Sequence, residues 1–305
     1  MSVPFEDVLK ERGIPFQNDV PTAGLCTFRI GGPCRRLIRP RCAGELIEAV
    51  RAARLCGERY AVLGGGSNVL FCDGVQNVSL ISTRGLDRIE AMSEHVRRVG
   101  AGVTLPRLAQ LAARDGWADL TFACGIPGTV GGGLYMNAGA YGKCLGERVV
   151  SVRAYDSEHD RIKTYFQKEL NISYRKTVFQ DINEIVLDVT LAFENRRSPA
   201  EIEAEMRALS AARRAAQPLS EPSAGSVFRR PAPDVPLGKI FDELGLKGLS
   251  CGGAAVSEKH AGFIVNRGGA TAADVLALIE KIQIITERER GFRPVTELCR
   301  IPEVK

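Results

Sequence analysis

The sequence predicts an α+β protein with two domains. Three observations support this prediction: a length of 305 residues, helical spacing of apolar residues in some segments with strand-like alternation in others, and a proline-rich break. The break spans residues 217–236 and contains Pro218, Pro222, Pro231, Pro233 and Pro236. Such a break is typical of a domain boundary that carries functional loops. We therefore expect a larger α+β domain before the break and a smaller α/β domain after it.

Helices are predicted where apolar residues recur with helical spacing between capping signals. Thr104 is a helix cap with Gly116 past the end, and Ser198-Pro-Ala-Glu201 is a capping box. The predicted helices cover 45–56, 104–116, 198–217, 239–244 and 271–290. The predicted strands cover 60–63, 69–71, 78–81, 96–99, 149–155, 162–166, 185–193 and 295–301, and the polar segment 156–161 is a hairpin turn.

The composition is that of an ordinary globular protein. The chain is 45% hydrophobic and 25% charged, with a net charge of +5. This charge suits an anionic small substrate, and the lack of a basic block with interleaved aromatic residues argues against nucleic acid. No signal-peptide pattern and no membrane-length apolar run is present, so we expect a cytoplasmic protein that needs no membrane and no obligate protein partner.

The cysteines and histidines do not form a metal-binding pattern. The chain has nine cysteines and three histidines, with no Cys-x-x-Cys and no histidine at zinc-ligand spacing. An odd number of cysteines without a secretion signal argues against a disulfide framework. We expect no metal and interpret most cysteines as small buried apolar residues.

A stretch of glycines at 124–142 is the most informative feature of the chain. Seven of its residues are glycine, and apolar residues such as Val130 and Leu134 lie between them. Glycine weakens regular structure and allows close approach of the backbone, whereas a flexible linker would be polar. We therefore expect a packed loop against a ligand, whose backbone N–H groups bind a phosphate.

A second glycine cluster, Gly64-Gly-Gly-Ser-Asn68, directly follows the predicted strand 60–63. A strand that leads into a glycine turn is a common phosphate-binding arrangement, although a tight structural turn explains this cluster equally well. It is not the Gly-x-Gly-x-x-Gly fingerprint, because Val69-Leu-Phe71 continues as strand rather than helix. Two such clusters in one chain favour a dinucleotide held by loops.

Seven side chains could take part in chemistry. Ser226 precedes an apolar pair and the arginines 229 and 230; a turn serine that bonds its own backbone is the favoured interpretation, and Arg229 and Arg230 either bind a diphosphate or carboxylate or lie exposed. Arg175 needs an anionic partner only if it is buried. Glu297 must be paired or protonated if it faces the core, and exposure is the commoner case. For Lys259 and His260, a surface turn is favoured over ligand contact.

At these residues the chain resembles the UDP-N-acetylenolpyruvoylglucosamine reductase family, from Thr27 nearly to its end. The resemblance rests on the two glycine turns, Ser-Tyr-Arg at 173–175, Ala-Gly-Ser-Val-Phe-Arg-Arg-Pro at 224–231 and Val-Ser-Glu-Lys-His-Ala-Gly-Phe-Ile-Val-Asn at 256–266. It implies a vanillyl-alcohol-oxidase-type (PCMH) FAD-binding domain over 22–195 and a substrate-binding C-terminal domain over 217–305. The length and the short connections around these motifs resemble the compact, type II form.

The resemblance also implies the site residues. FAD would be bound by the two glycine-rich turns, at Gly64, Gly65, Gly66, Ser67, Asn68, Gly125, Ile126, Pro127, Gly128, Thr129, Val130, Gly131, Gly132, Asn137 and Ala138. Tyr141 and Arg230 would contact a UDP-sugar substrate. NADPH would supply a hydride that reaches the vinyl carbon of the enolpyruvyl group through the flavin. Arg175 and a protonated Glu297 would stabilise the enolate-like charge, and Ser226 would donate a proton to the adjacent carbon.

The C-terminal strand departs from the family pattern. The family places two acids there, whereas Pro294-Val-Thr-Glu-Leu-Cys-Arg-Ile301 contains one, Glu297. If the segment aligned with the family in a different register, Cys299 would occupy the catalytic position. No residue would then fill the role that the resemblance gives to Glu297.

Two other functions stay open. One is a different FAD oxidase of the same fold acting on an alcohol or sugar. Such oxidases often tether the flavin through a histidine, and all three histidines of this chain lie outside the glycine turns, which counts against this function. The other is a flavin-holding module without catalysis, against which the intact Arg175 and Ser226 motifs argue.

Overall fold

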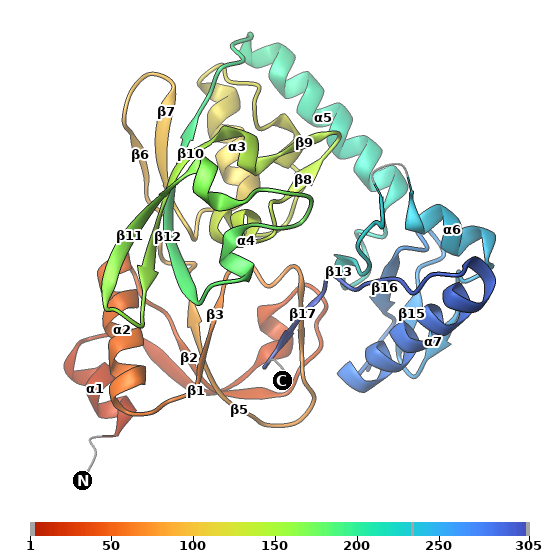
Figure 1. Ribbon diagram of the computed structural model, residues 1–305, viewed down its shortest axis with the longest axis horizontal. Helices are drawn as coiled ribbons and strands as arrows, with labels where there is room; N and C mark the ends of the chain where they lie inside the picture. Colours follow the sequence, from red (N-terminus) through yellow and green to blue (C-terminus); the bar gives the residue numbers. More distant parts are fainter. Residues whose placement is uncertain (1–3, 233–234, 303–305) are drawn as a thin grey trace. The chain divides into compact units, whose positions relative to one another are not determined.

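The computed structural model describes residues 4–232 and 235–302, so Pro233 of the predicted break lies outside it. The described chain forms two compact units (Figure 1). The first unit contains the chain up to Asn18, Arg36–Gly65 and Val78–Ala212, and the second contains Asp19–Arg35, Gly66–Asn77 and the chain from Arg213 onwards. Each unit is therefore assembled from segments that are far apart in the sequence.

The helices begin and end close to the predicted capping residues. Thr104 Oγ1 accepts a hydrogen bond from Arg107 N at 3.4 Å, and Thr271 with Asp274 forms a capping box. The helices are α1 Phe5–Glu11, α2 Ala43–Leu55, α3 Leu105–Arg114, α4 Val130–Tyr135, α5 Pro199–Ala216, α6 Leu237–Glu243 and α7 Ala272–Arg290. Across the described ranges, none of these helices has both the length and the apolar character needed to span a membrane.

The predicted hairpin at 156–161 belongs to an antiparallel sheet of the first unit, with the order β11-β10-β12-β7-β6. Its strands are β6 Ile89–Ala91, β7 Val96–Gly100, β10 Val149–Asp156, β11 Arg161–Phe166 and β12 Glu184–Ala192. A second sheet has the order β1-β2-β5-β3, with β1 Phe16–Pro21, β2 Pro33–Ile38, β3 Tyr60–Leu63 and β5 Gln76–Ser82. The short pair β8 Gly139–Ala140 and β9 Lys143–Cys144 also belongs to the first unit.

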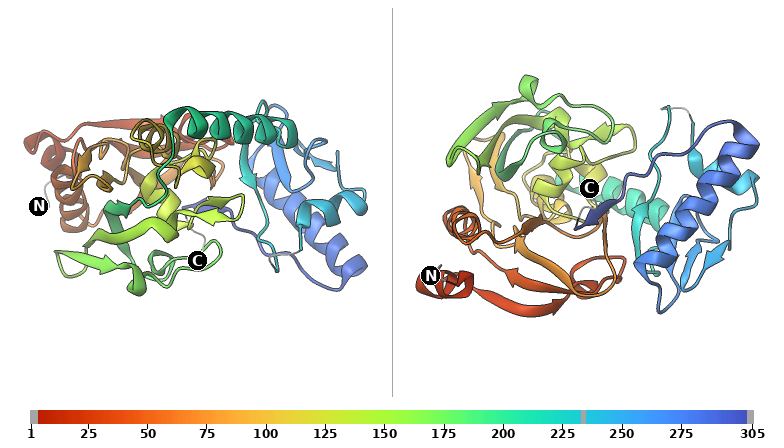
Figure 2. Two further views of the ribbon diagram at one scale, coloured as in Figure 1. Left: turned by 90° about the horizontal axis from the view of Figure 1, so that it is seen from above. Right: turned by 60° about the horizontal axis from the view of Figure 1, so that its bottom comes forward.

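The second unit contains a four-stranded sheet and a two-stranded one. The first has the order β13-β16-β15-β14, and α7 packs along its β14 and β15 strands (Figure 2). The second pairs β17 with β4 in parallel. The strands are β4 Val69–Phe71, β13 Ser223–Ser226, β14 Ser250–Cys251, β15 Ala254–Val256, β16 Phe263–Asn266 and β17 Cys299–Ile301. The mixture of helices and sheets in both units confirms the predicted α+β class.

The segment around Val130 is a helix, so the expectation of a loop throughout 124–142 was wrong at α4. Thr129 caps this helix by accepting a hydrogen bond from Gly132 N. Its glycines serve close packing: a Cβ at Gly131 would lie 2.8 Å from Ala101 Cβ, and one at Gly133 would lie 3.0 Å from Leu105 Cδ1. Close packing therefore outweighs the low helix propensity of glycine.

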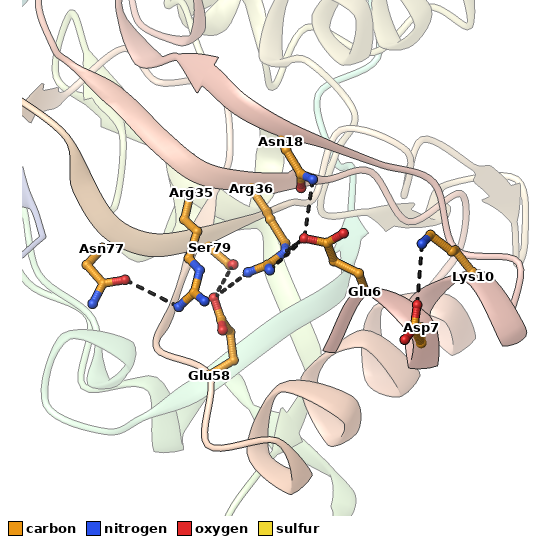
Figure 3. Close-up of polar contacts among 9 residues, drawn as sticks. All are labelled: Glu6, Asp7, Lys10, Asn18, Arg35, Arg36, Glu58, Asn77 and Ser79. Carbon is orange, nitrogen blue, oxygen red and sulfur yellow. Dashed lines mark hydrogen bonds and ion pairs between the residues drawn. The ribbon is translucent and has the colours of Figure 1, made fainter. Parts of the chain in front are cut away.

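Arg36 joins α1 to the sheet through an almost buried ion-pair cluster (Figure 3). Its guanidinium lies 2.7 Å from Glu6 Oε1 and 3.0 Å from Glu58 Oε1. Ser79 Oγ donates a further hydrogen bond to Glu58 at 2.7 Å. The side chains of Arg36 and Glu58 are 9% and 8% exposed, so the cation neutralises a carboxylate that is almost removed from water.

Replacing Arg36 with methionine is expected to lower the free energy of unfolding by about 3 kcal/mol, because one almost buried carboxylate and one half-buried carboxylate lose their shared cation. Urea denaturation measures the change. The control is Lys10→Ala, which removes an exposed ion pair with Asp7 in the same view (Figure 3) and should cost less than about 1 kcal/mol. Equal effects of the two substitutions would contradict the importance of the buried cluster.

The β10–β11 hairpin carries a carboxylate that makes stability depend on pH. The Asp156 side chain is 5% exposed and lies 2.8 Å from Lys163 Nζ. This hydrogen bond, with those from the backbone N–H of His159 and its side chain, holds the pKa of Asp156 well below its usual range. Since the folded pKa lies below the unfolded one, the stabilisation is complete above the unfolded pKa of about 3.9 and is lost as pH falls.

We expect Asp156→Asn to be less stable than the wild type at pH 7, with a difference that shrinks as pH falls below about 4. Urea denaturation at pH 7 and at pH 3 tests this, and the wild type at each pH is the reference. A difference that is equal at both pH values would show that the Asp156 charge does not stabilise the fold.

Candidate active site

Two glycine-rich segments of the first unit lie in direct contact. One follows β3 at Gly64 and Gly65, and the other precedes α4 at Gly128 and Thr129. A Cβ added to Gly64 would lie 2.7 Å from Thr129 Oγ1, and one added to Gly65 would lie 2.6 Å from Gly128 Cα. Because side chains do not tolerate such short distances, this contact requires glycine.

The backbone amides at this contact are available to a ligand. Within the described ranges, the N–H groups of Gly64, Gly65, Gly128 and Thr129 donate no hydrogen bond to the chain. Clustered backbone N–H groups of this kind bind the oxygen atoms of anions such as phosphate. The geometry of the two glycine segments is compatible with a bound phosphate group, and their assignment to the cofactor stays a prediction.

Asn137 is fully engaged by the chain itself. It is 5% exposed, its Nδ2 donates to Ser173 O at 2.8 Å, and its Oδ1 accepts from Gly146 N at 3.1 Å. Ala138 next to it is also buried, at 9% exposure. The assignment of both residues to the cofactor stays a prediction, and the observed role of Asn137 is to hold the Ser173 segment.

Arg175 lies in the tight turn that Asn137 holds. The backbones of Ser173 and Lys176 bond each other in both directions, at 3.0 and 3.2 Å. Arg175 has a φ of 56°, a left-handed conformation that is uncommon for a residue with a side chain. Its Nη1 donates to Gly139 O at 3.3 Å, and its guanidinium lies 5.4 Å from the centre of the Tyr174 ring.

Unusual backbone conformations gather at the predicted site residues. In the described chain, seven non-glycine residues have a positive φ, and three of these, Asn137, Tyr141 and Arg175, had been singled out from the sequence. Such strain is commonly found at functional sites. Tyr141 is 51% exposed, and its hydroxyl donates to Leu209 O at 3.1 Å.

In the second unit, Ser226 and Glu297 belong to neighbouring segments. Glu297 N donates to Val227 O at 2.9 Å, and Arg229 N donates to Val295 O at 2.8 Å. On the other side of the serine segment, Ser226 pairs with Phe263 of β16. The chain thus brings a serine and a carboxylic acid together across 71 residues of sequence.

The structure places Glu297, and not Cys299, beside the serine segment. The predicted strand 295–301 is divided: Thr296 bridges to Phe228, whereas Cys299 begins β17 and pairs with Val69. The expectation of one continuous strand was therefore wrong, because the chain changes its pairing partner between these residues.

Asn68 of the glycine turn also contacts the Glu297 segment. Its Nδ2 donates to Glu297 O at 2.8 Å, and its backbone O accepts from Cys299 N at 3.0 Å. Gly66 lies in the same unit, where its O accepts from Thr27 N at 3.1 Å. The assignment of Asn68 and its neighbour Ser67 to the cofactor stays a prediction.

Two basic groups lie near Ser226. The Nε atom of Arg229 is buried and has no hydrogen-bond partner in the described part of the chain, which is the state of a donor whose acceptor is a ligand or water. His260 Nδ1 accepts from Gly262 N at 3.1 Å, and burial is the largest cause that lowers the pKa of His260. Arg230 is exposed.

The structure groups the predicted residues by unit. The first unit brings together the Gly64–Gly65 turn with Gly128 and Thr129, and separately Asn137 with the Arg175 turn. The second unit brings together Ser226, Glu297 and Asn68. Sequence reasoning missed Gln180, which bonds the Arg175 backbone, because a single glutamine after a turn carries no sequence signal.

Comparisons with known proteins agree on one group of relatives. Residues 34–164 match a model described as "FAD binding domain", and residues 217–301 match "UDP-N-acetylenolpyruvoylglucosamine reductase, C-terminal domain". The chain is 39% identical over 301 residues to the UDP-N-acetylenolpyruvoylglucosamine reductase of Lactobacillus delbrueckii subsp. bulgaricus, covering 97% of this chain and 98% of that protein. It is 41% identical over 276 residues to UDP-N-acetylenolpyruvoylglucosamine reductase 2 of Symbiobacterium thermophilum, covering 89% and 87%.

A solved structure gives the same result. The crystal structure of UDP-N-acetylenolpyruvylglucosamine reductase from Thermus caldophilus matches with a TM-score of 0.78 and 32% identity, and the match covers 95% of this chain and 99% of that one. Together these matches confirm the predicted order of an FAD-binding domain followed by a smaller C-terminal domain.

Proposed function

The chain belongs to the UDP-N-acetylenolpyruvoylglucosamine reductase family, and we propose that it reduces the enolpyruvyl ether of UDP-N-acetylglucosamine to UDP-N-acetylmuramate with NADPH as hydride donor. The family and the FAD-binding domain make it a flavin-dependent oxidoreductase of peptidoglycan precursor synthesis. The proposal adds the identity of the hydride donor and the roles of the residues.

FAD is proposed to bind at the two glycine-rich segments. Its phosphate groups suit the backbone N–H groups of Gly64, Gly65, Gly128 and Thr129, which donate no hydrogen bond within the part of the chain that the structure describes. When bound, FAD supplies hydride transfer, and the protein supplies orientation and electrostatics. The assignment of Gly66, Ser67, Asn68, residues 125–132, Asn137 and Ala138 to this cofactor is part of the proposal.

The chemistry of the substrate explains the proposed roles of three side chains. Hydride addition to the terminal vinyl carbon builds negative charge on the adjacent carbon and its carboxylate. Arg175 and protonated Glu297 stabilise this charge as hydrogen-bond donors, and Ser226 donates a proton to the adjacent carbon. A serine is a weak acid, but the carbanionic carbon is a far stronger base. Tyr141 and Arg230 contact the UDP-sugar.

One observation carries the proposal most directly. The proposed proton donor and the proposed acidic stabiliser have to act on the same part of the substrate. The Glu297 N to Val227 O hydrogen bond of 2.9 Å, which joins their segments, supports these roles. The domain boundaries 22–195 and 217–305 and the cytoplasmic location stay predictions.

Two anaerobic half-reactions test the proposed function. The purified flavoprotein is first bleached with one equivalent of NADPH, and the enolpyruvyl ether of UDP-N-acetylglucosamine is then added. Rapid return of the oxidised flavin spectrum supports the reductase. A flavin that stays reduced until oxygen is admitted supports the alcohol or sugar oxidase, and a protein without bound flavin contradicts the proposal altogether.

A further inference from the structure

We propose that Gln180 is a positioning residue that fixes Arg175 for reduction of the substrate. This inference rests on the proposed function, because Arg175 matters to the reaction only if it stabilises the charge that develops there. Gln180 itself lies at the end of the single-turn segment Val178–Gln180 and would act only through Arg175.

The need for a positioning residue follows from the backbone of Arg175. Its φ of 56° costs about 1–3 kcal/mol in a residue with a side chain. A residue in such a conformation keeps it only where surrounding contacts hold it. The guanidinium is attached to this backbone, so a relaxed turn would move the charge that the reaction needs.

Gln180 supplies the contact that holds this backbone. Its Nε2 donates to Arg175 O at 2.8 Å and to Tyr135 O at 2.7 Å. A side-chain amide has two N–H donors, and here both are used on carbonyl groups from different segments. Gln180 is half-buried, which protects these hydrogen bonds from competition with water.

The second carbonyl connects the Arg175 turn to the glycine-rich helix. Tyr135 is the last residue of α4, the helix whose first turn contains the end of the predicted cofactor segment 125–132. One glutamine therefore fixes the Arg175 backbone relative to the element beside the proposed flavin site. A displacement of about 1 Å at such a group can cost about 100-fold in rate.

The surrounding contacts make a positioning role separable from a structural one. Thr177 Oγ1 also donates to Tyr135 O, at 3.2 Å, and Asn137 still holds Ser173 O. Removal of Gln180 therefore leaves the turn attached to the first unit while it removes the hydrogen bonds to Arg175 O and Tyr135 O. Thr177→Val is the matched control, because it removes a bond to the same Tyr135 carbonyl without touching Arg175.

The first test separates the two half-reactions in Gln180→Leu. We expect reoxidation of the reduced flavin by the enolpyruvyl substrate to slow about 10- to 100-fold, with FAD content and reduction by NADPH changed less than about 2-fold. Gln180→Lys keeps a donor on a long side chain and should recover part of the rate. Equal slowing of both half-reactions, or an equal effect of Thr177→Val, would overturn the inference.

The second test combines Gln180→Leu with Arg175→Ala. If Gln180 acts through Arg175, the glutamine substitution has no further effect on reoxidation once the arginine is gone. If the rate losses of the two single substitutions instead multiply in the double variant, the inference is overturned. A wild type that the substrate does not reoxidise contradicts the proposed function and removes the basis of the inference, whereas an active wild type with an unaffected Gln180→Leu contradicts the inference alone.

A third test does not depend on activity. Glycine adopts a φ near 56° without strain, so a glycine at position 175 no longer needs to be held. Gln180→Leu should therefore lower the melting temperature of the wild type by more than it lowers that of Arg175→Gly. If Gln180→Leu lowers the melting temperature of the wild type and of Arg175→Gly by the same amount, Gln180 does not restrain Arg175.

Discussion

Alanine at position 226 is expected to slow reoxidation of the reduced flavin by the enolpyruvyl substrate by about 10²- to 10⁴-fold, the usual contribution of a positioned general acid. The hydroxyl is the proposed source of the proton that reaches the carbon next to the one receiving hydride. No proton donor is needed for NADPH to reduce the flavin, so that half-reaction should keep its rate. Stopped-flow absorbance under anaerobic conditions measures both steps.

The control for this substitution lies in the same strand. Ser223 begins β13 and Ser226 ends it, so Ser223→Ala makes the same chemical change without removing the proposed acid. Ser223→Ala should leave the rates of both half-reactions within about 2-fold of the wild type, because a larger rate loss is expected only when the general acid itself is removed. Full turnover by Ser226→Ala would exclude Ser226 as the proton donor, and slow flavin reduction in that variant would indicate damage to the fold.

The helices and most strands could be predicted because their signals are local. Thr104, Ser198 and Thr271 cap helices whose apolar residues recur with helical spacing. The polar segment between β10 and β11 forms the predicted hairpin. In each case the sequence contains both the periodicity and the capping or turn residue that ends it.

The predictions for two elements were wrong because tertiary contacts determine the structure of these segments. The glycines of α4 were read as loop-forming, yet Gly131 and Gly133 are needed where the helix meets Ala101 and Leu105. The last segment was read as one strand, yet Thr296 pairs with Phe228 and Cys299 with Val69. Neither neighbour is visible in the local sequence, so propensity and alternation alone could not identify them.

The candidate site shows the same division. Ser226 and Glu297 come together through backbone pairing between distant segments, and sequence reasoning from the residues alone favoured an ordinary turn serine and an exposed acid. The resemblance to the reductase family supplied their roles. Gln180 was missed by both approaches, because its contribution lies in two hydrogen bonds to carbonyl groups, and carbonyl groups are present at every residue.

Arg175→Gly should separate catalysis from stability most clearly, because the reaction rate is expected to fall while the free energy of unfolding is kept or rises. The substitution removes the guanidinium that stabilises the developing charge, and loss of one such donor costs about 10²- to 10³-fold in rate. It also relieves a left-handed backbone, because Arg175 has a φ of 56°, which glycine adopts readily. Relief of this strain stabilises the fold by about 1–3 kcal/mol. Loss of the hydrogen bond to Gly139 O and the greater freedom of the unfolded chain with glycine both reduce this gain.

We therefore expect Arg175→Gly to reoxidise its flavin about 10²- to 10³-fold more slowly while its free energy of unfolding stays equal to that of the wild type or rises by up to about 1 kcal/mol. Stopped-flow absorbance and urea denaturation of the same preparation measure the two quantities. Asn171→Gly is the matched control: Asn171 also has a positive φ, of 47°, but no proposed role, so it should change stability in the same direction and leave both half-reactions intact. A variant that loses activity and stability together would mean that Arg175 holds the turn in place, and its proposed role in catalysis would then have no independent support.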